Sequence, residues 1–433
     1  MKYEEAMRYI TEVGNFGSSY GLERTVRLLE LLDNPQNKIK TIHIAGTNGK
    51  GSTTAMISKI LMGNGYKVGM YTSPFLEEFE ERIQINRVNI PKEKLATLMD
   101  ELKIAVDKVI EEGYNHPTEF EIITCLMFLH FYKEKVDFAV IEVGLGGRLD
   151  STNVITPILS IITSISYDHT NILGNTLSEI AGEKAGIIKP NVPVVIFPQE
   201  EDVLQVIKTK CEKLKSPLYI VNSTDGELID IVQMEKPYQK VKIKGEINNY
   251  NVNLPLLGEH QILNLALAIK GIEVLEKYNK VEISREILEE SLKDVTWNGR
   301  LEVMKKSPFI VIDGAHNIQG ITKLKENIEK YFKYENIYLI LGILADKDVE
   351  EMIKVITPMA KEIYTVTPNS VRAELALDLR DEVVKYNKNC IAFEEYEDAL
   401  EKSLESANDE DIIIVSGSLY MIGGMRTLIK NRI

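Results

Sequence analysis

Apolar residues recur at helical spacing near the start of the chain and in short clustered runs further along it. Two amphipathic stretches, residues 3–13 and 22–32, predict helices. The second stretch carries apolar side chains about one turn apart, at Leu22, Val26, Leu29 and Leu32. The pair Asn34-Pro35 breaks this pattern. Beyond it, short runs rich in isoleucine and valine alternate with helical patterns, which is typical of a parallel sheet covered by helices.

The first part of the chain contains the clearest predicted strands, which are residues 39–45, 136–143 and 158–165. Residues 200–255 differ because they contain short β-type runs with polar breaks, such as 241–247. We expect this segment to form a small antiparallel addition at the edge of the first domain. A helical pattern over residues 261–277 follows it.

A new series of strands begins after residue 307. Short apolar runs at 309–312, 337–343, 362–366 and 411–416 are each followed by a helical pattern. This alternation predicts a second, smaller doubly wound domain of the Rossmann-like type. We place a linker or hinge at 295–300, between a first domain of 1–294 and a second of 301–433. The predicted fold class is α/β, with a mostly parallel sheet in the first domain.

Length and charge limit the classes of partner. A chain of 433 residues is too long for one compact core, which supports the division into two domains. It has 51 basic and 65 acidic side chains, for a formal net charge of −14 at pH 7. This balance argues against nucleic acid or an anionic membrane as a partner, since each would favour a basic face. An anionic substrate must therefore be bound by local charge, backbone amides or metal ions.

Cysteine usage and hydropathy indicate a compartment. Cys125, Cys211 and Cys390 lie far apart and form no C-x-x-C pair, which argues against a disulfide scaffold and against a zinc cage. The first residues contain no apolar core of signal-peptide length. No run approaches the roughly 18 apolar residues that a membrane span needs. We expect a soluble cytoplasmic protein, acting as a monomer.

A glycine-rich segment follows the predicted strand 39–45 and precedes a helical pattern. Its glycines, Gly46, Gly49 and Gly51, allow the backbone to curl so that amide groups face an anion. Free N–H groups at the start of the next helix also favour phosphate. Lys50 would reach the β- and γ-phosphates of a nucleotide, and the Ser52 hydroxyl would meet magnesium.

The segment departs from the strict G-x-x-x-x-G-K-[ST] pattern, because Gly46 lies three residues before Gly49 and Gly51 follows Lys50. A plain glycine turn would nevertheless give no reason for Lys50 or for the hydroxyl run after it. The strand before and the helix after it predict an ATP site in a P-loop ATPase domain. The loop residues predicted to bind ATP are Gly46, Thr47, Asn48, Gly49, Lys50, Gly51 and Ser52.

Polar residues at the ends of two further strands are candidate metal ligands. Glu142 lies near the carboxyl end of the apolar strand 136–143, where open α/β sheets bind their ligands. A buried carboxylate needs a partner, for which a metal ion and Arg148 are the alternatives. His169 follows the strand 158–165. The residue type alone leaves a metal ligand and a structural histidine equally open, since magnesium prefers oxygen.

Lys184 lies in a helix-like segment of small residues, 180–187, rather than on an obviously solvated face. One interpretation is a functional lysine. The alternative is an ion pair with Glu183 or another acid.

Taken together, these residues resemble the folylpolyglutamate synthase and dihydrofolate synthase family of the Mur ligase superfamily. The resemblance covers nearly the whole chain, and its motifs occur in order. They are Tyr20-Gly21-Leu22-Glu23, Asn34-Pro35, the loop Ala45 to Ser52, Thr72-Ser73-Pro74, Glu81-Arg82-Ile83, Glu142 to Asn153, Asp168-His169-Thr170, Glu183 to Pro190, Gly258-Glu259-His260-Gln261 with Asn264, Gly299-Arg300-Leu301-Glu302, Asp313-Gly314-Ala315-His316-Asn317 and Asp346-Lys347-Asp348.

The resemblance implies a ligase that couples ATP hydrolysis to amide formation between a folate or dihydropteroate carboxylate and L-glutamate. It implies magnesium as cofactor, with two ions, and small molecules as the partners. The implied magnesium ligands are Ser52, Ser73, Glu142 and His169. Lys184 matches a carboxylated lysine, and His316 joins Lys50 and Lys184 as a catalytic residue. The implied nucleotide contacts beyond the loop are Asn264, Arg300, Asp313 and His316, the last three from across the domain cleft.

Two departures and two alternative functions accompany this interpretation. The family usually has histidine where this chain has Phe75, and proline where it has Asn298. A regulatory nucleotide switch would need a guanine-reading [NT]-K-x-D element, and 345–348 lacks its leading residue. A cell-wall Mur ligase would carry an extra N-terminal domain, for which the roughly 45 residues before the loop are too few. The choice between dihydropteroate, reduced folate or both stays open.

Overall fold

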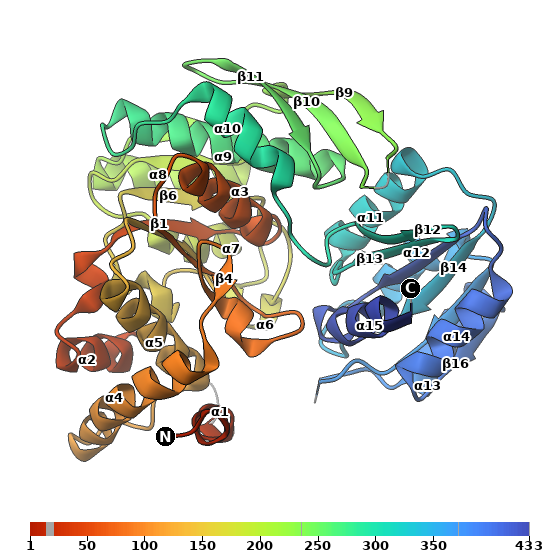
Figure 1. Ribbon diagram of the computed structural model, residues 1–433, viewed down its shortest axis with the longest axis horizontal. Coiled ribbons are helices and arrows are strands. Elements are labelled where there is room, and N and C mark those ends of the chain that lie inside the picture. Colours follow the sequence, from red (N-terminus) through yellow and green to blue (C-terminus); the bar gives the residue numbers. More distant parts are fainter. Residues whose placement is uncertain (14–20, 235, 371, 433) are drawn as a thin grey trace. The chain divides into compact units, whose positions relative to one another are not determined.

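The computed structural model describes residues 1–13, 21–234, 236–370 and 372–432 (Figure 1). Tyr20, which opens the first of the motifs, lies outside the described residues. The chain forms two compact units. Unit 1 consists of Met1–Gly226, Ile243–Tyr250 and Leu263–Leu292, and unit 2 of Glu227–Lys242, Asn251–Ile262 and Lys293–Ile433. The limits proposed for the two domains stay a prediction.

Unit 1 contains an eight-stranded sheet in the order β4-β3-β2-β5-β1-β6-β7-β8. The pairs from β2 to β8 are parallel, and the two pairs at the β4 edge are antiparallel. This confirms the mostly parallel sheet and the strands expected at β1, β5 and β6. The strands are β1 (Lys40–Ala45), β2 (Val68–Tyr71), β3 (Ile83–Ile85), β4 (Val88–Asn89), β5 (Phe138–Glu142), β6 (Leu159–Ile162), β7 (Val194–Ile196) and β8 (Leu218–Ile220).

Helices pack on this sheet because its central strands are apolar on both sides. Ala139 and Ile141 of β5 belong to the same core cluster as the apolar faces of α4 and α5. The helical predictions over 3–13, 22–32 and 261–277 are confirmed as α1, α2 and α9. The helices of this part are α1 (Tyr3–Val13), α2 (Glu23–Leu31), α3 (Lys50–Gly63), α4 (Lys92–Glu111), α5 (Glu119–Lys133), α6 (Thr170–Leu173), α7 (Leu177–Lys184), α8 (Glu201–Leu214), α9 (Glu259–Lys277) and α10 (Arg285–Ser291).

The expectation for residues 200–255 is partly wrong. Helix α8 occupies the start of this segment, because Val203, Ile207 and Cys211 recur at a spacing of four and are buried in one core cluster. The β-type runs do form β9 (Gly226–Val232), β10 (Tyr238–Lys244) and β11 (Asn249–Leu254). They make a three-stranded sheet of their own rather than extending the eight-stranded sheet, to whose edge β8 is added instead. The short connection from β10 to β11 permits only antiparallel pairing.

Unit 2 contains a six-stranded sheet in the order β12-β13-β17-β14-β15-β16. All its pairs are parallel except β12 with β13, and the four strands expected from the sequence are confirmed as β13, β14, β15 and β17. The strands are β12 (Glu302–Lys306), β13 (Phe309–Asp313), β14 (Ile337–Leu341), β15 (Glu362–Thr365), β16 (Cys390–Ala392) and β17 (Ile412–Ser416). The helices are α11 (Ile318–Tyr331), α12 (Val349–Ile356), α13 (Ala376–Val383), α14 (Tyr396–Ser406) and α15 (Leu419–Arg432).

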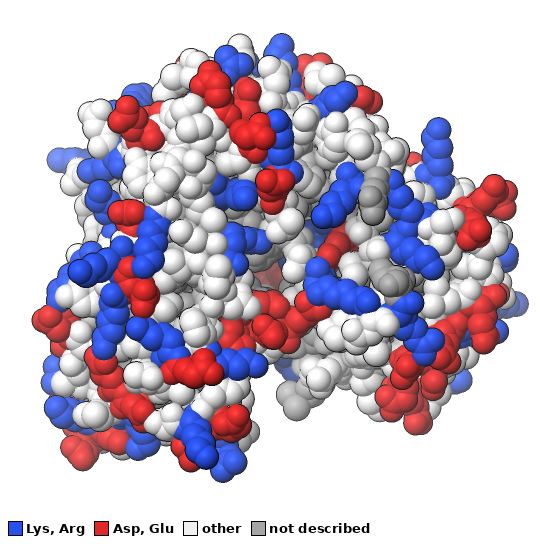
Figure 2. Space-filling model, in the orientation of Figure 1, with Lys and Arg blue, Asp and Glu red and all other residues white. Residues whose placement is uncertain are grey.

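On the face drawn in Figure 2, acidic and basic side chains are interspersed over the surface rather than separated into two fields. None of the helices in the described part of the chain is both long and apolar enough to span a membrane.

Candidate active site

The loop after β1 requires glycine at two positions. Gly46 has φ 146°, and a Cβ there would overlap the Thr163 hydroxyl. Gly49 has φ 89° and caps the N-terminus of α3. A Cβ at Gly49 would lie 2.5 Å from Oδ1 of Asn264, a buried residue of α9. Only glycine tolerates these backbone angles and leaves enough space for the neighbouring side chains. The curved loop can therefore pack closely against Thr163 and Asn264.

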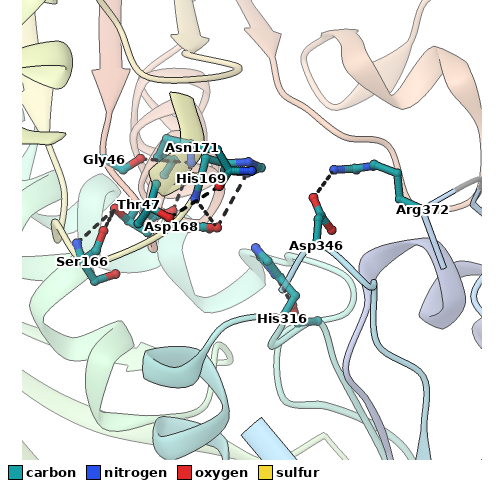
Figure 3. Close-up of polar contacts among 12 residues, drawn as sticks. Gly46, Thr47, Ser166, Asp168, His169, Asn171, His316, Asp346 and Arg372 are labelled. Atoms are coloured by element: carbon teal, nitrogen blue, oxygen red, sulfur yellow. Dashed lines mark hydrogen bonds and ion pairs between the residues drawn. The ribbon is translucent and has the colours of Figure 1, made fainter. Parts of the chain in front are cut away.

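The segment after β6 fastens this loop through hydrogen bonds. The Thr47 amide donates to the Ser164 carbonyl at 2.7 Å, and the Ser164 hydroxyl donates to the Asn48 carbonyl at 3.2 Å. The Thr47 hydroxyl donates to the Ser166 carbonyl and accepts from the Ser166 amide, both at 3.1 Å (Figure 3). The sequence offered no local signal for this attachment, since the partners are more than a hundred residues apart.

Lys50 begins α3 and folds back over the loop. Its Nζ donates to the carbonyls of Gly46 at 3.2 Å and Thr47 at 3.1 Å. The same Nζ lies 4.0 Å from Oε1 of Glu142. Ser52 is buried in the first turn of the helix. A cation, a buried hydroxyl and a helix N-terminus therefore surround the loop, which is the combination that phosphate binding uses.

Glu142 is the last residue of β5, and only 5% of its surface is exposed. In the sheet it pairs in register with Ile44 of β1, just before the loop. The alternative partner Arg148 is engaged elsewhere, because its guanidinium binds Glu183 at 2.9 Å. Glu183, in turn, was the alternative partner of Lys184. Arg148 and Glu183 therefore pair with each other, and the alternative of another acid for Lys184 stays open, since the charge of Asp168 acts on this lysine.

Lys184 is the last residue of α7 and is 3% exposed. Its Nζ donates to the carbonyl of Gly46 at 2.8 Å. The pKa of Lys184 is lowered to about 7, mainly by burial and also by the nearby charge of Lys50, whereas the charge of Asp168 opposes the shift. Near neutral pH a large fraction of this amine is therefore uncharged, which is unusual for a lysine.

Asp168 and His169 follow β6 in a tight turn. His169 has φ 50° and precedes α6, and its amide donates to Oδ1 of Asp168 at 2.9 Å (Figure 3). The His169 Nε2 lies 3.8 Å from the same oxygen. Asp168 had no role in the sequence interpretation, although the motif contains it. Its charge acts on Lys184 and its carboxylate lies beside His169, so Asp168 joins the candidate site.

The predicted magnesium ligands all follow parallel strands at one edge of the sheet. Ser73 comes two residues after β2, Glu142 ends β5, Ser52 lies beyond β1 and His169 lies beyond β6. These four strands are adjacent and parallel, so their carboxyl ends share an edge. Among the described residues, no group of three or more His, Cys, Asp or Glu side chains that could hold a metal occurs. One buried carboxylate with hydroxyl groups fits magnesium, which takes few protein carboxylates when phosphates supply further oxygens.

Unit 2 brings together three other predicted residues. Asp313 ends β13 and accepts the amides of Leu301 and Ala315, each at 2.8 Å. Burial raises the pKa of Asp313, and the charge of Arg300 opposes that rise. A Cβ at Gly314 would lie 2.5 Å from Nη1 of Arg300, so this glycine leaves room for the guanidinium.

His316 follows in the same loop, and its Nδ1 donates to the Gly314 carbonyl at 2.8 Å. Because a carbonyl only accepts, Nδ1 carries a proton. Also in unit 2, Asp346 after β14 binds Arg372 at 2.7 Å (Figure 3). The motif Asp346-Lys347-Asp348 is therefore anchored within unit 2.

The chain matches two families that together define a class of enzyme. The family described as the Mur ligase middle domain matches residues 44–271, and the Mur ligase glutamate ligase domain matches residues 299–419. The dihydrofolate synthase/folylpolyglutamate synthase of Bacillus subtilis is 40% identical over 431 residues, which cover 99% of each chain. The chain belongs to the folylpolyglutamate synthase and dihydrofolate synthase family of the Mur ligase superfamily, and it is an ATP-dependent ligase.

Solved structures agree with this assignment. The folylpolyglutamate synthase of Mycobacterium tuberculosis, complexed with ADP and AMPPCP, has a TM-score of 0.89 at 28% identity and 99% coverage of both chains. An FPGS–AMPPCP–folate complex has a TM-score of 0.87 at 33% identity, covering 99% of this chain and 100% of the other. These findings favour the folate ligase interpretation over a cell-wall ligase and over a nucleotide switch.

Proposed function

We propose that this chain joins L-glutamate to a carboxylate of a folate or a dihydropteroate, using ATP bound at the loop 46–52. The Bacillus subtilis relative is named for both activities, and one similar structure contains folate with AMPPCP. The observation that carries the proposal is the arrangement around the loop: Lys50, Glu142 and Lys184 all approach it. That arrangement suits transfer of a phosphoryl group to an acceptor, where catalysis is mainly positioning and charge stabilisation.

Each predicted nucleotide contact has a role in this proposal. The amides of the loop Gly46–Ser52 and the N-terminus of α3 bind the phosphates, and Lys50 stabilises charge on the transferring group. Asn264 and the unit 2 residues Arg300, Asp313 and His316 bind the rest of the nucleotide. Ser52, Ser73, Glu142 and His169 would hold magnesium, with two ions. Bound there, magnesium would supply positive charge against the phosphate oxygens.

The chemical problem is that a carboxylate is a poor acceptor for an amine at neutral pH. In the proposed path, an oxygen of the acceptor carboxylate attacks the γ-phosphorus, and the bond to ADP breaks. The amine of glutamate then attacks the acyl carbon, loses a proton, and inorganic phosphate leaves with its electron pair. One carboxylate oxygen thus ends in phosphate, which identifies the acyl phosphate path.

The experiment labels that oxygen. The enzyme receives ATP, L-glutamate and either ¹⁸O-labelled dihydropteroate or labelled reduced folate, and the phosphate is analysed by mass spectrometry. We expect one ¹⁸O per phosphate with at least one acceptor, and an amide product of matching mass. A nucleotide-linked cell-wall peptide serves as the control acceptor and should give no product. Product without label in phosphate would exclude the acyl phosphate, and product only with the control acceptor would exclude the function.

Lys184 is proposed to act as a carbamate. Its pKa of about 7 leaves much of the amine neutral, and a neutral amine can attack carbon dioxide, form an N–C bond and lose a proton. The product replaces a buried cation with an anion. Such an anion supplies hard oxygens to magnesium or braces a ligand such as His169.

Two measurements test the carbamate. Lys184→Ala should lose most activity, and millimolar acetate should restore part of it by occupying the vacated space. In the unchanged enzyme, ¹³C-labelled carbon dioxide should give a carbamate carbon resonance that Lys184→Ala lacks. Full activity of Lys184→Ala, or no resonance in the active enzyme, would contradict the role.

We also infer that the enzyme works as a monomer in the cytoplasm. Cys125, Cys211 and Cys390 are free thiols, which a reducing compartment preserves. Light scattering of the purified chain tests the monomer, and fractionation of cells tests the compartment.

A further inference from the structure

The turn that carries Arg300 has an unusual backbone. Gly299 has φ 70° and Leu301 has φ 44°, so a left-handed residue stands on each side of the arginine. Leucine seldom adopts this conformation, which persists only where the surrounding structure imposes it. The neighbouring contacts must therefore fix the turn.

Two carboxylates fix the turn from opposite sides. The Gly299 amide donates to Oε2 of Glu302 at 2.7 Å, and the Leu301 amide donates to Oδ2 of Asp313 at 2.8 Å. The Gly314 amide also donates to the Gly299 carbonyl at 2.8 Å. The backbone of Arg300 thus lies between two anchored peptide groups. Asp313 is a predicted nucleotide contact, whereas Glu302 had no role in the site.

Glu302 is itself held by an arginine from the end of the chain. The Arg426 Nε lies 3.0 and 2.9 Å from the two Glu302 oxygens, and its Nη2 lies 2.7 Å from Oε1. Arg426 belongs to α15 and only 8% of its surface is exposed. Bidentate contact with a buried guanidinium fixes the orientation of the Glu302 carboxylate as well as its distance from Arg426. The Glu302 oxygen that receives the Gly299 amide therefore has a defined position.

We propose that Arg426 and Glu302 form a positioning pair, which sets the conformation of the 299–302 turn and thereby aims Arg300 at the nucleotide. Neither residue touches substrate in this proposal. It rests on the proposed role of Arg300 in binding ATP. The competing explanation is that the pair only ties α15 to β12 and stabilises unit 2.

A double-mutant cycle separates these two explanations. Arg426→Met removes the guanidinium that binds Glu302 while keeping much of the side-chain volume. Arg300→Ala removes the guanidinium that is proposed to bind ATP. If the pair acts through Arg300, Arg426→Met raises the KM for ATP about tenfold, and it has little further effect in the Arg300→Ala background. The KM for glutamate and the kcat at saturating ATP should change much less. Equal effects in both backgrounds would overturn the proposal.

A variant of Glu302 and a control variant on α15 complete the test. Glu302→Gln retains an oxygen for the Gly299 amide but lacks the charge that holds Arg426, so it should raise the KM for ATP less than Arg426→Met does. Arg432→Met is the matched control, because Arg432 also lies on α15 and binds Glu397 at 2.9 Å, but on the exposed surface. It should leave the KM for ATP unchanged.

Stability is measured on every variant by thermal unfolding. If Arg426→Met does not fold, Arg426→Lys replaces it, since lysine keeps the charge and loses the bidentate geometry. A lowered unfolding midpoint with an unchanged KM for ATP would mean that the pair is structural only. An Arg300→Ala variant with normal KM and kcat would instead refute the proposed role of Arg300, which is a different failure.

Discussion

The loop at residues 46–52 in unit 1 and the turn at 299–302 in unit 2 are held in different ways. The loop is fastened by main-chain groups: the Thr47 amide and the Asn48 carbonyl bind Ser164, and Gly46 fits against Thr163. The turn is fastened by side-chain carboxylates, since Glu302 and Asp313 each receive one of its amides. One region depends on glycine and strand-end backbone, and the other on charged side chains.

This difference has a consequence for mutation. The side chains of Thr47, Lys50 and Lys184 also bind the loop, but its main-chain bond to Ser164 remains when Lys50 is removed, so that loss should change chemistry more than geometry. In the carboxylate-held turn, removing a side chain removes a support of the backbone itself. Substitutions in unit 2 should therefore alter the affinity for nucleotide even where the substituted residue touches no ligand.

The largest effect is expected for Lys50→Ala. Loss of the ammonium removes charge stabilisation during phosphoryl transfer, which should lower kcat by about 100- to 1,000-fold. The unfolding midpoint should stay close to that of the unchanged enzyme, because the loop backbone has its own hydrogen bonds. Lys59→Ala in the same helix is the control and should retain full activity. Near-normal turnover of Lys50→Ala would contradict the site, and loss of folding would contradict main-chain support.

Gly46→Ala breaks the main-chain-held loop directly. The new methyl group would overlap the Thr163 side chain and lie 3.1 Å from the Thr163 amide nitrogen, and the residue would keep a backbone conformation that alanine avoids. Because the opposing atoms belong to a β-branched side chain and the backbone, they cannot move aside cheaply. We expect a loss of about 1–3 kcal/mol in the free energy of unfolding and little remaining activity. Denaturant unfolding and phosphate release measure the two effects.

Gly314→Ala makes the corresponding change in unit 2, with a smaller effect. The new methyl group would meet the ends of flexible side chains, Leu419 Cδ2 and Arg300 Nη1. These groups can shift, so the protein should fold with nearly unchanged stability, while displacement of Arg300 raises the KM for ATP several-fold. A stability loss as large as that of Gly46→Ala would contradict the comparison.

Local patterns predicted most of the fold. Strands such as β5 and β17 were visible because every residue in them is buried, so the sequence shows an apolar run that ends in a single polar residue, Glu142 or Ser416. Helix α8 was missed because polar residues outnumber apolar ones in its sequence, and its buried side chains are those of Val203, Ile207 and Cys211. Its buried residues do recur every four positions. The short β-type runs with polar breaks that follow led instead to a β interpretation of the whole segment.

The sequence indicated those parts of the candidate site that lie in one continuous segment. These are the glycine loop and the end of β5. Ser164 binds Asn48 across 116 residues of sequence, and Arg426 binds Glu302 across 124. No local pattern reports such pairs, because they arise from the way the strands are ordered in each sheet. Glu302 and Asp168 lay inside quoted motifs, yet their partners, and hence their roles, required the fold.

The smallest effect concerns pH and the strand that carries the main-chain-held loop. His43 lies in β1, three residues before Gly46, and burial lowers its pKa to about 3, with a smaller contribution from Lys189. Its Nε2 lies 2.8 Å from the Thr152 hydroxyl, which donates to Asp150. The hydroxyl therefore accepts from Nε2, and the ring is neutral with its proton on that nitrogen.

The sign of the pH effect follows from this neutral ring. In the unfolded chain the histidine binds a proton below its ordinary pKa of about 6.5, whereas the folded ring stays neutral down to about 3. Well above pH 6.5 neither state binds a proton at this ring, so His43 contributes no pH dependence there. As the pH falls through 6.5, the unfolded state becomes more favoured, by about 0.7 kcal/mol between pH 7 and pH 6.

His43→Gln tests this contribution because glutamine keeps a donor for Thr152 but does not titrate. The free energy of unfolding, measured in denaturant at pH 7 and pH 6, should fall by about 0.7 kcal/mol less for the variant than for the unchanged chain. The ligase activity of the variant at pH 7 should be retained, because the loop is held by its own main-chain bonds to Ser164. An equal loss of stability in both proteins would show that His43 binds protons alike in the folded and unfolded states, which would contradict its lowered pKa. A loss of activity without a loss of stability would show that the strand beneath the loop, and not only its main-chain bonds, sets the geometry of the site.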